Sequence, residues 1–168
     1  LLKYKIKSEG LIIRSINTLQ QRLKSSLEAK LLLLEDNDFK VSFDSLMSHL
    51  FSTYRKGGRL YIAGNGGSAA DSQHLATELV CRFASDRQPI PAEALTTDTS
   101  LLTAIANDYG FDEIFARQID AKVTSKDFFL AISTSGNSAN IYKAILQCKS
   151  LDISCALLTG PSAGKCIG

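Results

Sequence analysis

Features typical of membrane and exported proteins are missing from this sequence. Its apolar runs are short, as at residues 31–34, whereas a helix that crosses a bilayer needs about 20 predominantly apolar residues. The N-terminal residues also lack the basic segment, apolar core and small-residue cleavage site of an export signal. We therefore expect a soluble, cytoplasmic protein without a membrane partner.

Neither sign of charge is in large excess. The 19 basic and 17 acidic residues give a formal net charge of +2 and are spread along the whole chain. A nucleic-acid-binding protein normally gathers its basic residues into one patch or stripe. We therefore expect no nucleic-acid partner, and we expect any anionic ligand to be held by local groups.

Cysteine and histidine are both scarce, with four and two residues respectively. Cys81, Cys148, Cys155 and Cys166 form no CxxC pair, and no histidine lies close enough in sequence to complete a zinc-finger ligand set with them. We expect buried free thiols rather than disulfides, as is usual in a reducing cytosol.

Two helices are predicted in the N-terminal part of the chain. Apolar residues recur there at helical spacing until the polar residues 35–38 interrupt them. This apolar stripe consists of Leu11, Ile12, Ile16, Leu19, Leu23, Leu27, Leu31 and Leu34. A second helix is predicted from about Ser42 to Gly57 and Gly58, with His49 packed inside the resulting hairpin. The stripe is more apolar than a lone helix needs, so we expect it to contact another subunit.

From residue 59 onward the sequence repeats one unit, a short apolar run followed by a polar turn and a helical stretch. The four apolar runs are residues 59–63, 92–95, 128–132 and 153–158. This order predicts an α/β fold with a doubly wound, mostly parallel sheet. We therefore expect a helical extension over residues 1–58 and an α/β domain over residues 59–168, with ligands bound at the carboxyl ends of the strands.

The first of these turns is rich in glycine and reads Gly64-Asn65-Gly66-Gly67-Ser68. Such a turn lets the backbone approach a ligand, and the helix that follows points free N–H groups at it. With Ala69 the turn also fits the GxGxxA form of a dinucleotide-binding motif, although neither Asp86 nor Glu93, the candidate acidic partners, ends a clean strand. A tight turn without any ligand is the third possibility for this loop alone.

A second turn favours a phosphate over a dinucleotide. Ser133-Thr134-Ser135-Gly136-Asn137-Ser138 places four hydroxyls between a strand and a helix, where hydroxyls and N–H groups can converge on a dianion. A helix cap would need only one of them. A third turn, at residues 160–165, has its glycines too close together for a P-loop and is followed by Cys166 where serine or threonine is required.

The helix after the first turn carries polar residues on one face. His74, Glu78 and Arg82 recur at intervals of four, with Asp71 one turn before them. A histidine and a carboxylate one turn apart can share a divalent metal, or the carboxylate can act as a base. The alternative is a solvated face with an ion pair between Glu78 and Arg82. The nearby glycine-rich turn favours the chemical role.

Three stretches of the chain closely resemble the phosphoheptose isomerases of the SIS (sugar isomerase) superfamily. They are GNGGSAADSQHLATELVCRF at residues 64–83, LTTDTSLLTAIANDYGFDEIFARQ at residues 95–118 and AISTSGNSANI at residues 131–141. The resemblance implies a flavodoxin-like SIS fold. It also implies conversion of sedoheptulose 7-phosphate to D-glycero-D-manno-heptose 7-phosphate, for the heptose of lipopolysaccharide or surface glycans.

The resemblance assigns roles to individual residues. It implies zinc bound by His74 and Glu78, with Glu78 also the base that moves a proton between C1 and C2 through an enediol. The implied substrate-binding residues are Asn65, Gly66, Gly67, Glu78, Asn107, Asp108, Ser133, Thr134, Ser135 and Ser138. It further implies a homotetramer. Relatives continue past the position of Gly168 into a helix that supplies a glutamine and a histidine, so we expect one zinc per subunit with further ligands beyond Gly168, and a complete catalyst only with that helix.

Two alternatives without catalysis share this fold. Initiator-associating proteins bind a replication initiator as tetramers, but they tend to lack the carboxylate at the position of Glu78 and differ at the position of Ser135. Both residues are present here and favour the enzyme. A regulatory SIS module that senses sugar phosphate would need an attached DNA-binding domain, and none is visible in this sequence.

Overall fold

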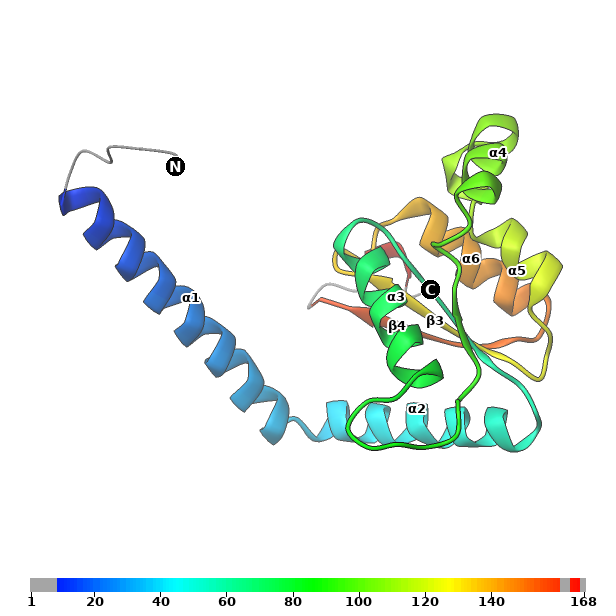
Figure 1. Ribbon diagram of the computed structural model, residues 1–168, viewed down its shortest axis with the longest axis horizontal. Helices are drawn as coiled ribbons and strands as arrows, with labels where there is room; N and C mark the ends of the chain where they lie inside the picture. The colour runs from blue at the N-terminus through cyan, green and yellow to red at the C-terminus, as the bar shows by residue number, and fades with distance from the viewer. Residues whose placement is uncertain (1–8, 161–163, 167–168) are drawn as a thin grey trace. The chain divides into compact units, whose positions relative to one another are not determined.

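The computed structural model describes residues 9–160 and 164–166 (Figure 1). The chain divides into two compact units, Leu1–Ser45 and Leu46–Gly168. Helix α1 spans Glu9–Glu35 and helix α2 spans Asn37–Arg55, so the division falls inside α2. Within the described residues, no helix is both long and apolar enough to cross a membrane.

Helix α2 begins earlier than the sequence predicted. Asp36 separates the two helices, and its carboxylate accepts a hydrogen bond of 2.9 Å from the N–H of Phe39. An aspartate in this position caps the start of a helix. The predicted start near Ser42 is therefore wrong, because the polar residues initiate α2 instead of forming a loop.

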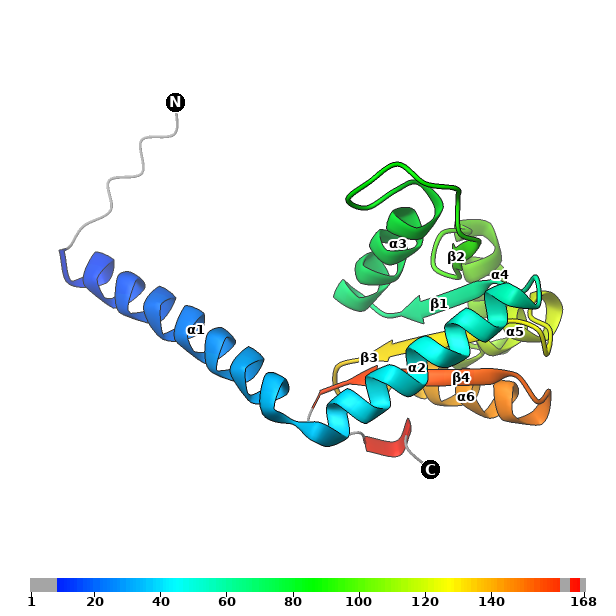
Figure 2. The same cartoon turned by 90° about the horizontal axis from the view of Figure 1, so that it is seen from below.

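The second unit is built on a four-stranded sheet in the order β2-β1-β3-β4. Its strands are β1 (Leu60–Gly64), β2 (Ala92–Ala94), β3 (Phe128–Ser133) and β4 (Ser154–Thr159). Every neighbouring pair is parallel, and β1 and β3 visibly point the same way (Figure 2). The connecting helices are α3 (Gly67–Val80), α4 (Thr99–Tyr109), α5 (Ala116–Lys122) and α6 (Ala139–Ser150), with short 3-10 turns η1 (Phe111–Glu113) and η2 (Gly164–Cys166). The predicted α/β class with a doubly wound parallel sheet is confirmed.

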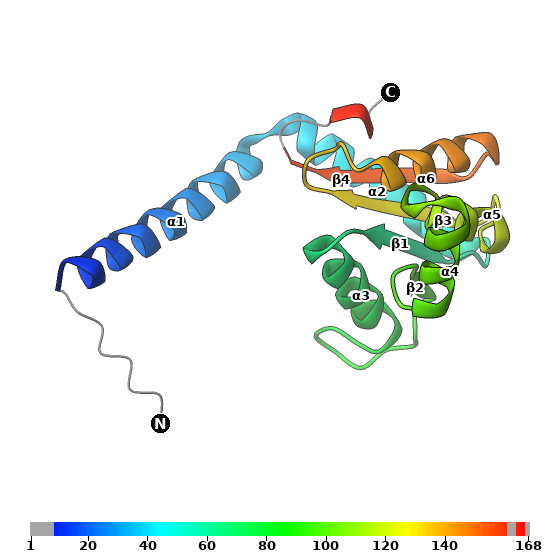
Figure 3. The same ribbon diagram turned by 90° about the horizontal axis from the view of Figure 1, so that it is seen from above.

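Alternate residues of each central strand face two separate cores. On one face, Leu60, Ile62 and Leu130 pack with α3 and the C-terminal half of α2. On the other face, Tyr61 and Phe129 pack with α4, α5 and α6, and α6 runs alongside β4 (Figure 3). Because both faces are covered, β1 and β3 are buried along their whole length. The covered sheet is a rigid platform for the loops at its ends.

His49 lies in the part of α2 that belongs to the second unit. Its side chain is exposed, and its ring centroid lies 6.4 Å from that of Phe128 in β3. The residues of α2 that face the sheet are Leu46, Leu50 and Tyr54, one helical turn apart. His49 is next to this stripe and borders the sheet.

All four cysteines are free, as predicted. Cys148 and Cys166 are buried and Cys155 is partly buried. Cys81, which follows α3, is exposed and is the exception to the expected burial.

Candidate functional site

The order of the strands places the ends of β1 and β3 side by side. From β1 the chain first crosses to β2 on one side and then returns to β3 on the other. In open parallel sheets ligands bind outside the carboxyl ends of the strands at such a reversal. Gly64, the last residue of β1, is in register with Ile132 near the end of β3. The glycine-rich turn at residues 64–68 and the serine-rich turn at residues 133–138 therefore leave the sheet at one place.

The glycine-rich turn brings the start of α3 close to the end of β1. Gly66 has φ +56°, a conformation that residues with a side chain rarely adopt. A Cβ atom on Gly64 would lie 2.6 Å from Cβ and the backbone oxygen of Ser68. Gly66 is the N-cap of α3 and supplies no side-chain cap. The N–H groups of Ser68 and Ala69 donate to the carbonyls of Asn65 and Gly66 at 3.0 and 3.1 Å, so no side chain stands between the start of α3 and a ligand near Gly67.

The serine-rich turn leaves the start of α6 without a side-chain cap as well. Ser138 is the N-cap of α6, but its hydroxyl lies 3.0 Å from the hydroxyl of Ser133 and does not cap the helix. The Ser135 hydroxyl accepts a bond of 3.2 Å from the N–H of Asn137, and both Thr134 and Ser135 are exposed. Exposed hydroxyls and an uncapped helix start are the groups that hold phosphate without a cation.

Two asparagines join the two turns. The Asn65 side chain donates to Asn140 Oδ1 at 2.8 Å, and the Asn140 side chain donates to Asn65 Oδ1 at 2.9 Å. Asn140 lies in the first turn of α6 and is only 2% exposed, while Asn65 is partly exposed. Sequence reasoning missed Asn140. Its one signal was its place beside the serine-rich turn.

The turn after β4 supports the serine-rich turn. Gly160 N–H donates to the Thr134 carbonyl at 3.1 Å, and Cys166 N–H donates to the Gly136 carbonyl at 3.0 Å. Lys165 N–H donates to Asn137 Oδ1 at 3.2 Å. Residues 161–163 of this turn lie outside the described part of the chain. The described residues hold the serine-rich turn in place, a function that their sequence did not indicate.

His74 and Glu78 lie together on α3. Nε2 of His74 is 3.3 Å from Oε1 of Glu78, and the two side chains are 78% and 30% exposed. Among the ion pairs of the described residues, Glu78 is therefore paired with His74 and not with Arg82. The Arg87 side chain donates to the backbone carbonyls of Glu78 and Leu79 at 2.6 and 2.8 Å. It therefore provides hydrogen-bond partners for carbonyls at the end of α3. Sequence reasoning did not find Arg87.

Two predicted metal ligands, His74 and Glu78, lie in the described part of the chain. A histidine nitrogen and a carboxylate oxygen are both groups that zinc accepts. No group of three or more histidine, cysteine, aspartate or glutamate side chains that could hold a metal occurs in residues 9–160 and 164–166. The described residues alone do not fit a closed zinc site, which normally takes four ligands.

Asn107 and Asp108 lie at the end of α4, and both are exposed. The Asn107 amide donates to Asp108 Oδ1 at 2.7 Å. Asp108 also lines a cavity of about 230 Å³ between α4 and α5, where the Arg117 guanidinium lies 3.7 Å from the centre of the Tyr109 ring. The side chains of Asn107 and Asp108 thus contact each other. Among the described residues, no hydrogen bond joins either of them to the glycine-rich or serine-rich turn.

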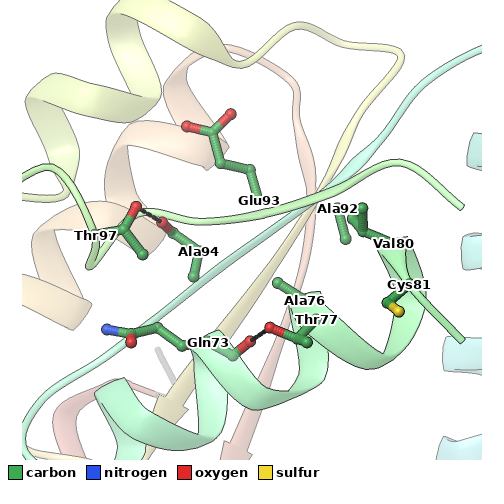
Figure 4. Close-up of a pocket in the computed structure, with 9 residues that line it drawn as sticks. All are labelled: Gln73, Ala76, Thr77, Val80, Cys81, Ala92, Glu93, Ala94 and Thr97. Carbon is green, nitrogen blue, oxygen red and sulfur yellow. Dashed lines mark hydrogen bonds between the residues drawn. The ribbon is translucent and has the colours of Figure 1, made fainter. Parts of the chain in front are cut away.

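A cavity of about 440 Å³ lies between α3 and the edge strand β2 (Figure 4). Gln73 and Thr77 line it from α3, and Ala92 and Ala94 from β2. The Gln73 side chain also donates to Thr96 Oγ1 at 3.1 Å. None of the predicted site residues lines this cavity, so it is separate from the two turns.

Comparison with known proteins identifies close relatives. The SIS domain family matches residues 33–160. A phosphoheptose isomerase from Aneurinibacillus thermoaerophilus is 45% identical over 147 residues, which are 88% of this chain and 74% of the relative. Two solved phosphoheptose isomerase structures are also similar. The one from Neisseria gonorrhoeae has a TM-score of 0.78 and 36% identity, covering 93% of this chain and 78% of that one. The one from Francisella tularensis has a TM-score of 0.84 and 35% identity, and the match covers 89% of this chain and 78% of that one.

Proposed function

This chain belongs to the SIS domain family and, within it, to the phosphoheptose isomerases, and we propose that it converts sedoheptulose 7-phosphate to D-glycero-D-manno-heptose 7-phosphate. The reaction is an aldose-ketose isomerisation. Its carbonyl moves from C2 of the ketose to C1 of the aldose, and no atom is gained or lost.

The observation that carries this proposal is the pair of turns at the switch point. Helices α3 and α6 both start there without a side-chain cap, at the ends of the adjacent strands β1 and β3. Helix starts of this kind favour an anion. The exposed hydroxyls of Thr134 and Ser135 add donors for phosphate oxygens. The serine-rich turn is thus suited to hold the 7-phosphate, with Asn65 and the glycine-rich turn beside the rest of the sugar.

Glu78 is the residue that we assign to proton transfer. A carboxylate base removes the proton from C1 of the ketose to give an enediolate, and the same group returns a proton to C2. A second group must move the hydroxyl proton between O1 and O2. The Glu78 side chain is partly exposed and has a polar neighbour at 3.3 Å, His74 Nε2. It is therefore open to solvent and free to exchange a proton.

We also propose one zinc ion per subunit, held by His74 and Glu78 together with ligands outside the described residues. Held by these residues, zinc would supply Lewis-acid polarisation of the sugar carbonyl. Support comes from the two donors on one face of α3, 3.3 Å apart. Asn107 and Asp108 would contact the sugar hydroxyls, because their exposed amide and carboxylate groups can both bond to them.

A homotetramer in the cytoplasm is the assembly that we propose. The described part of the apolar stripe, from Ile16 to Leu34, is exposed on α1, with Leu23 62% and Leu27 58% exposed. Exposed apolar surface of this extent normally marks a partner interface. The product would supply ADP-heptose synthesis for lipopolysaccharide core or surface glycans.

The direct test is conversion of the substrate by the purified full-length protein. With sedoheptulose 7-phosphate as the only sugar, we expect the proton NMR signals of an aldoheptose phosphate to appear. Phosphate-free sedoheptulose should turn over poorly. Failure of a folded, zinc-loaded protein to form the aldose would contradict the proposal, and binding of a replication initiator without turnover would favour the alternative.

A further inference from the structure

The paired asparagines at the switch point have a feature that substrate binding by Asn65 alone does not explain. Both hydrogen bonds of the pair are short, at 2.8 and 2.9 Å, and one partner is 2% exposed. We propose that Asn140 is a positioning residue that holds the Asn65 amide in the orientation in which it binds the sugar phosphate. This inference rests on the proposed isomerase function.

The chemistry of the amide group explains how one asparagine can serve two partners. A primary amide has two N–H donors and two carbonyl lone pairs. In the pair, each amide uses one N–H and one lone pair on the other. Asn65 therefore keeps one donor and one acceptor. Because Asn140 is buried and Asn65 is partly exposed, the remaining groups of Asn65 are the ones that can reach a ligand.

The pair also connects the two turns mechanically. Asn65 directly follows β1, and Asn140 is the second residue of α6, 75 positions later. Among the described residues, these two hydrogen bonds are the ones that join the glycine-rich turn to the serine-rich turn or to α6. Fixing the Asn65 amide therefore also fixes the start of the glycine-rich turn against the start of α6.

Preorganisation of this kind mainly affects binding. A ligand that meets an amide already held in place loses less conformational entropy on binding than one that must order the side chain itself. Without Asn140, the Asn65 side chain is free to rotate and to bond with water. We expect the Michaelis constant to rise and the turnover number to change less.

The experiment is a double-mutant cycle on the full-length protein with sedoheptulose 7-phosphate. Asn140→Ala should raise KM about tenfold to a hundredfold, the usual effect of losing hydrogen bonds to a buried polar group. Asn65→Ala should raise it at least as much. The double variant should be no worse than Asn65→Ala, because Asn140 acts through Asn65. Gln147→Ala is the matched control, since it removes a 2.9 Å amide bond to Asp120 from the same helix and should leave KM unchanged.

Four outcomes are informative. A merely structural Asn140 would lower the melting temperature and the active fraction, and hence the apparent kcat, with KM unchanged, and this would overturn the inference. Additive effects in the double variant would also overturn it. If Asn140→Ala fails to fold, Asn140→Ser, which keeps a smaller polar group at this position but loses the amide, should show the same rise in KM. A wild-type protein without isomerase activity would instead refute the proposed function, so the two failures are distinguishable.

Discussion

At the scale of single residues, Glu78 is the centre of the proposed chemistry. Glu78→Gln keeps the size and hydrogen-bonding capacity of the side chain but cannot accept a proton. We expect turnover to fall by about 10² to 10⁴, the usual contribution of a general base, with KM changed much less. Steady-state kinetics of the full-length enzyme measure this. Glu113→Gln, which alters a carboxylate paired with Lys143 outside the site, is the control. Turnover near the wild-type rate with zinc still bound would reduce Glu78 to a ligand at most.

Ser135 tests the location of the phosphate. Its exposed hydroxyl accepts from Asn137 N–H at 3.2 Å and can still donate to a ligand. Ser135→Ala removes a hydrogen bond to a charged group, worth about 1.5 to 3 kcal/mol, and should raise KM about tenfold to a hundredfold. Ser150→Ala, at the far end of α6, is the control and should leave KM unchanged. An unchanged KM for Ser135→Ala would move the phosphate to the glycine-rich turn.

His74 tests the metal. His74→Ala removes the nitrogen donor that lies 3.3 Å from Glu78, so we expect the full-length protein to lose most of its zinc. Elemental analysis after dialysis measures the metal content directly. His49→Ala serves as the control because His49 borders the sheet at Phe128 and is not on α3. Equal zinc in the wild type and in His74→Ala would exclude this residue from the metal site.

At the scale of elements, the junction of β1 and α3 depends on close approach of the backbone. A side chain at Gly64 would meet Cβ and the backbone oxygen of Ser68 at 2.6 Å. We expect Gly64→Ala to destabilise the fold by about 1 to 3 kcal/mol, as overpacking usually does, and to lower the melting temperature. At Gly67, by contrast, a Cβ atom meets nothing within 4 Å. A Gly64→Ala variant as stable as Gly67→Ala would show that the junction is less tightly packed than described.

Elements with a strong local pattern were predictable. The runs at 59–63 and 128–132 match β1 and β3 closely, because a buried parallel strand is a continuous apolar run. The start of α2 could not be predicted in the same way, because an aspartate such as Asp36 is as common in a loop as at a helix cap. The role of the turn after β4 was also hidden, since its hydrogen bonds go to residues 134, 136 and 137 and not to its neighbours.

At the scale of the whole molecule, the exposed face of α1 predicts association. Leu23→Lys and Leu27→Lys together would place two charges in the apolar stripe. We expect this double variant to sediment as a smaller species than the wild type, for which we propose a tetramer, at micromolar concentration, because burying the charges is costly. Gln21→Lys and Ser25→Lys keep the same spacing on the opposite face of the helix and should not change the sedimentation. A wild-type monomer, or an unchanged tetramer in the Leu23 and Leu27 variant, would contradict the prediction.

The order of strands, turns and helices, the two polar turns and the family could all be predicted from the chain. These features depend on local spacing and on short motifs, which can be recognised without knowing how the chain folds. Which strand lies beside which became known only from the folded arrangement. The order β2-β1-β3-β4 sets the glycine-rich turn against the serine-rich turn, and so brings Asn65 to Asn140 across 75 residues of chain. Local pattern carries no information on such pairing, because any buried strand of the sheet has the same apolar run.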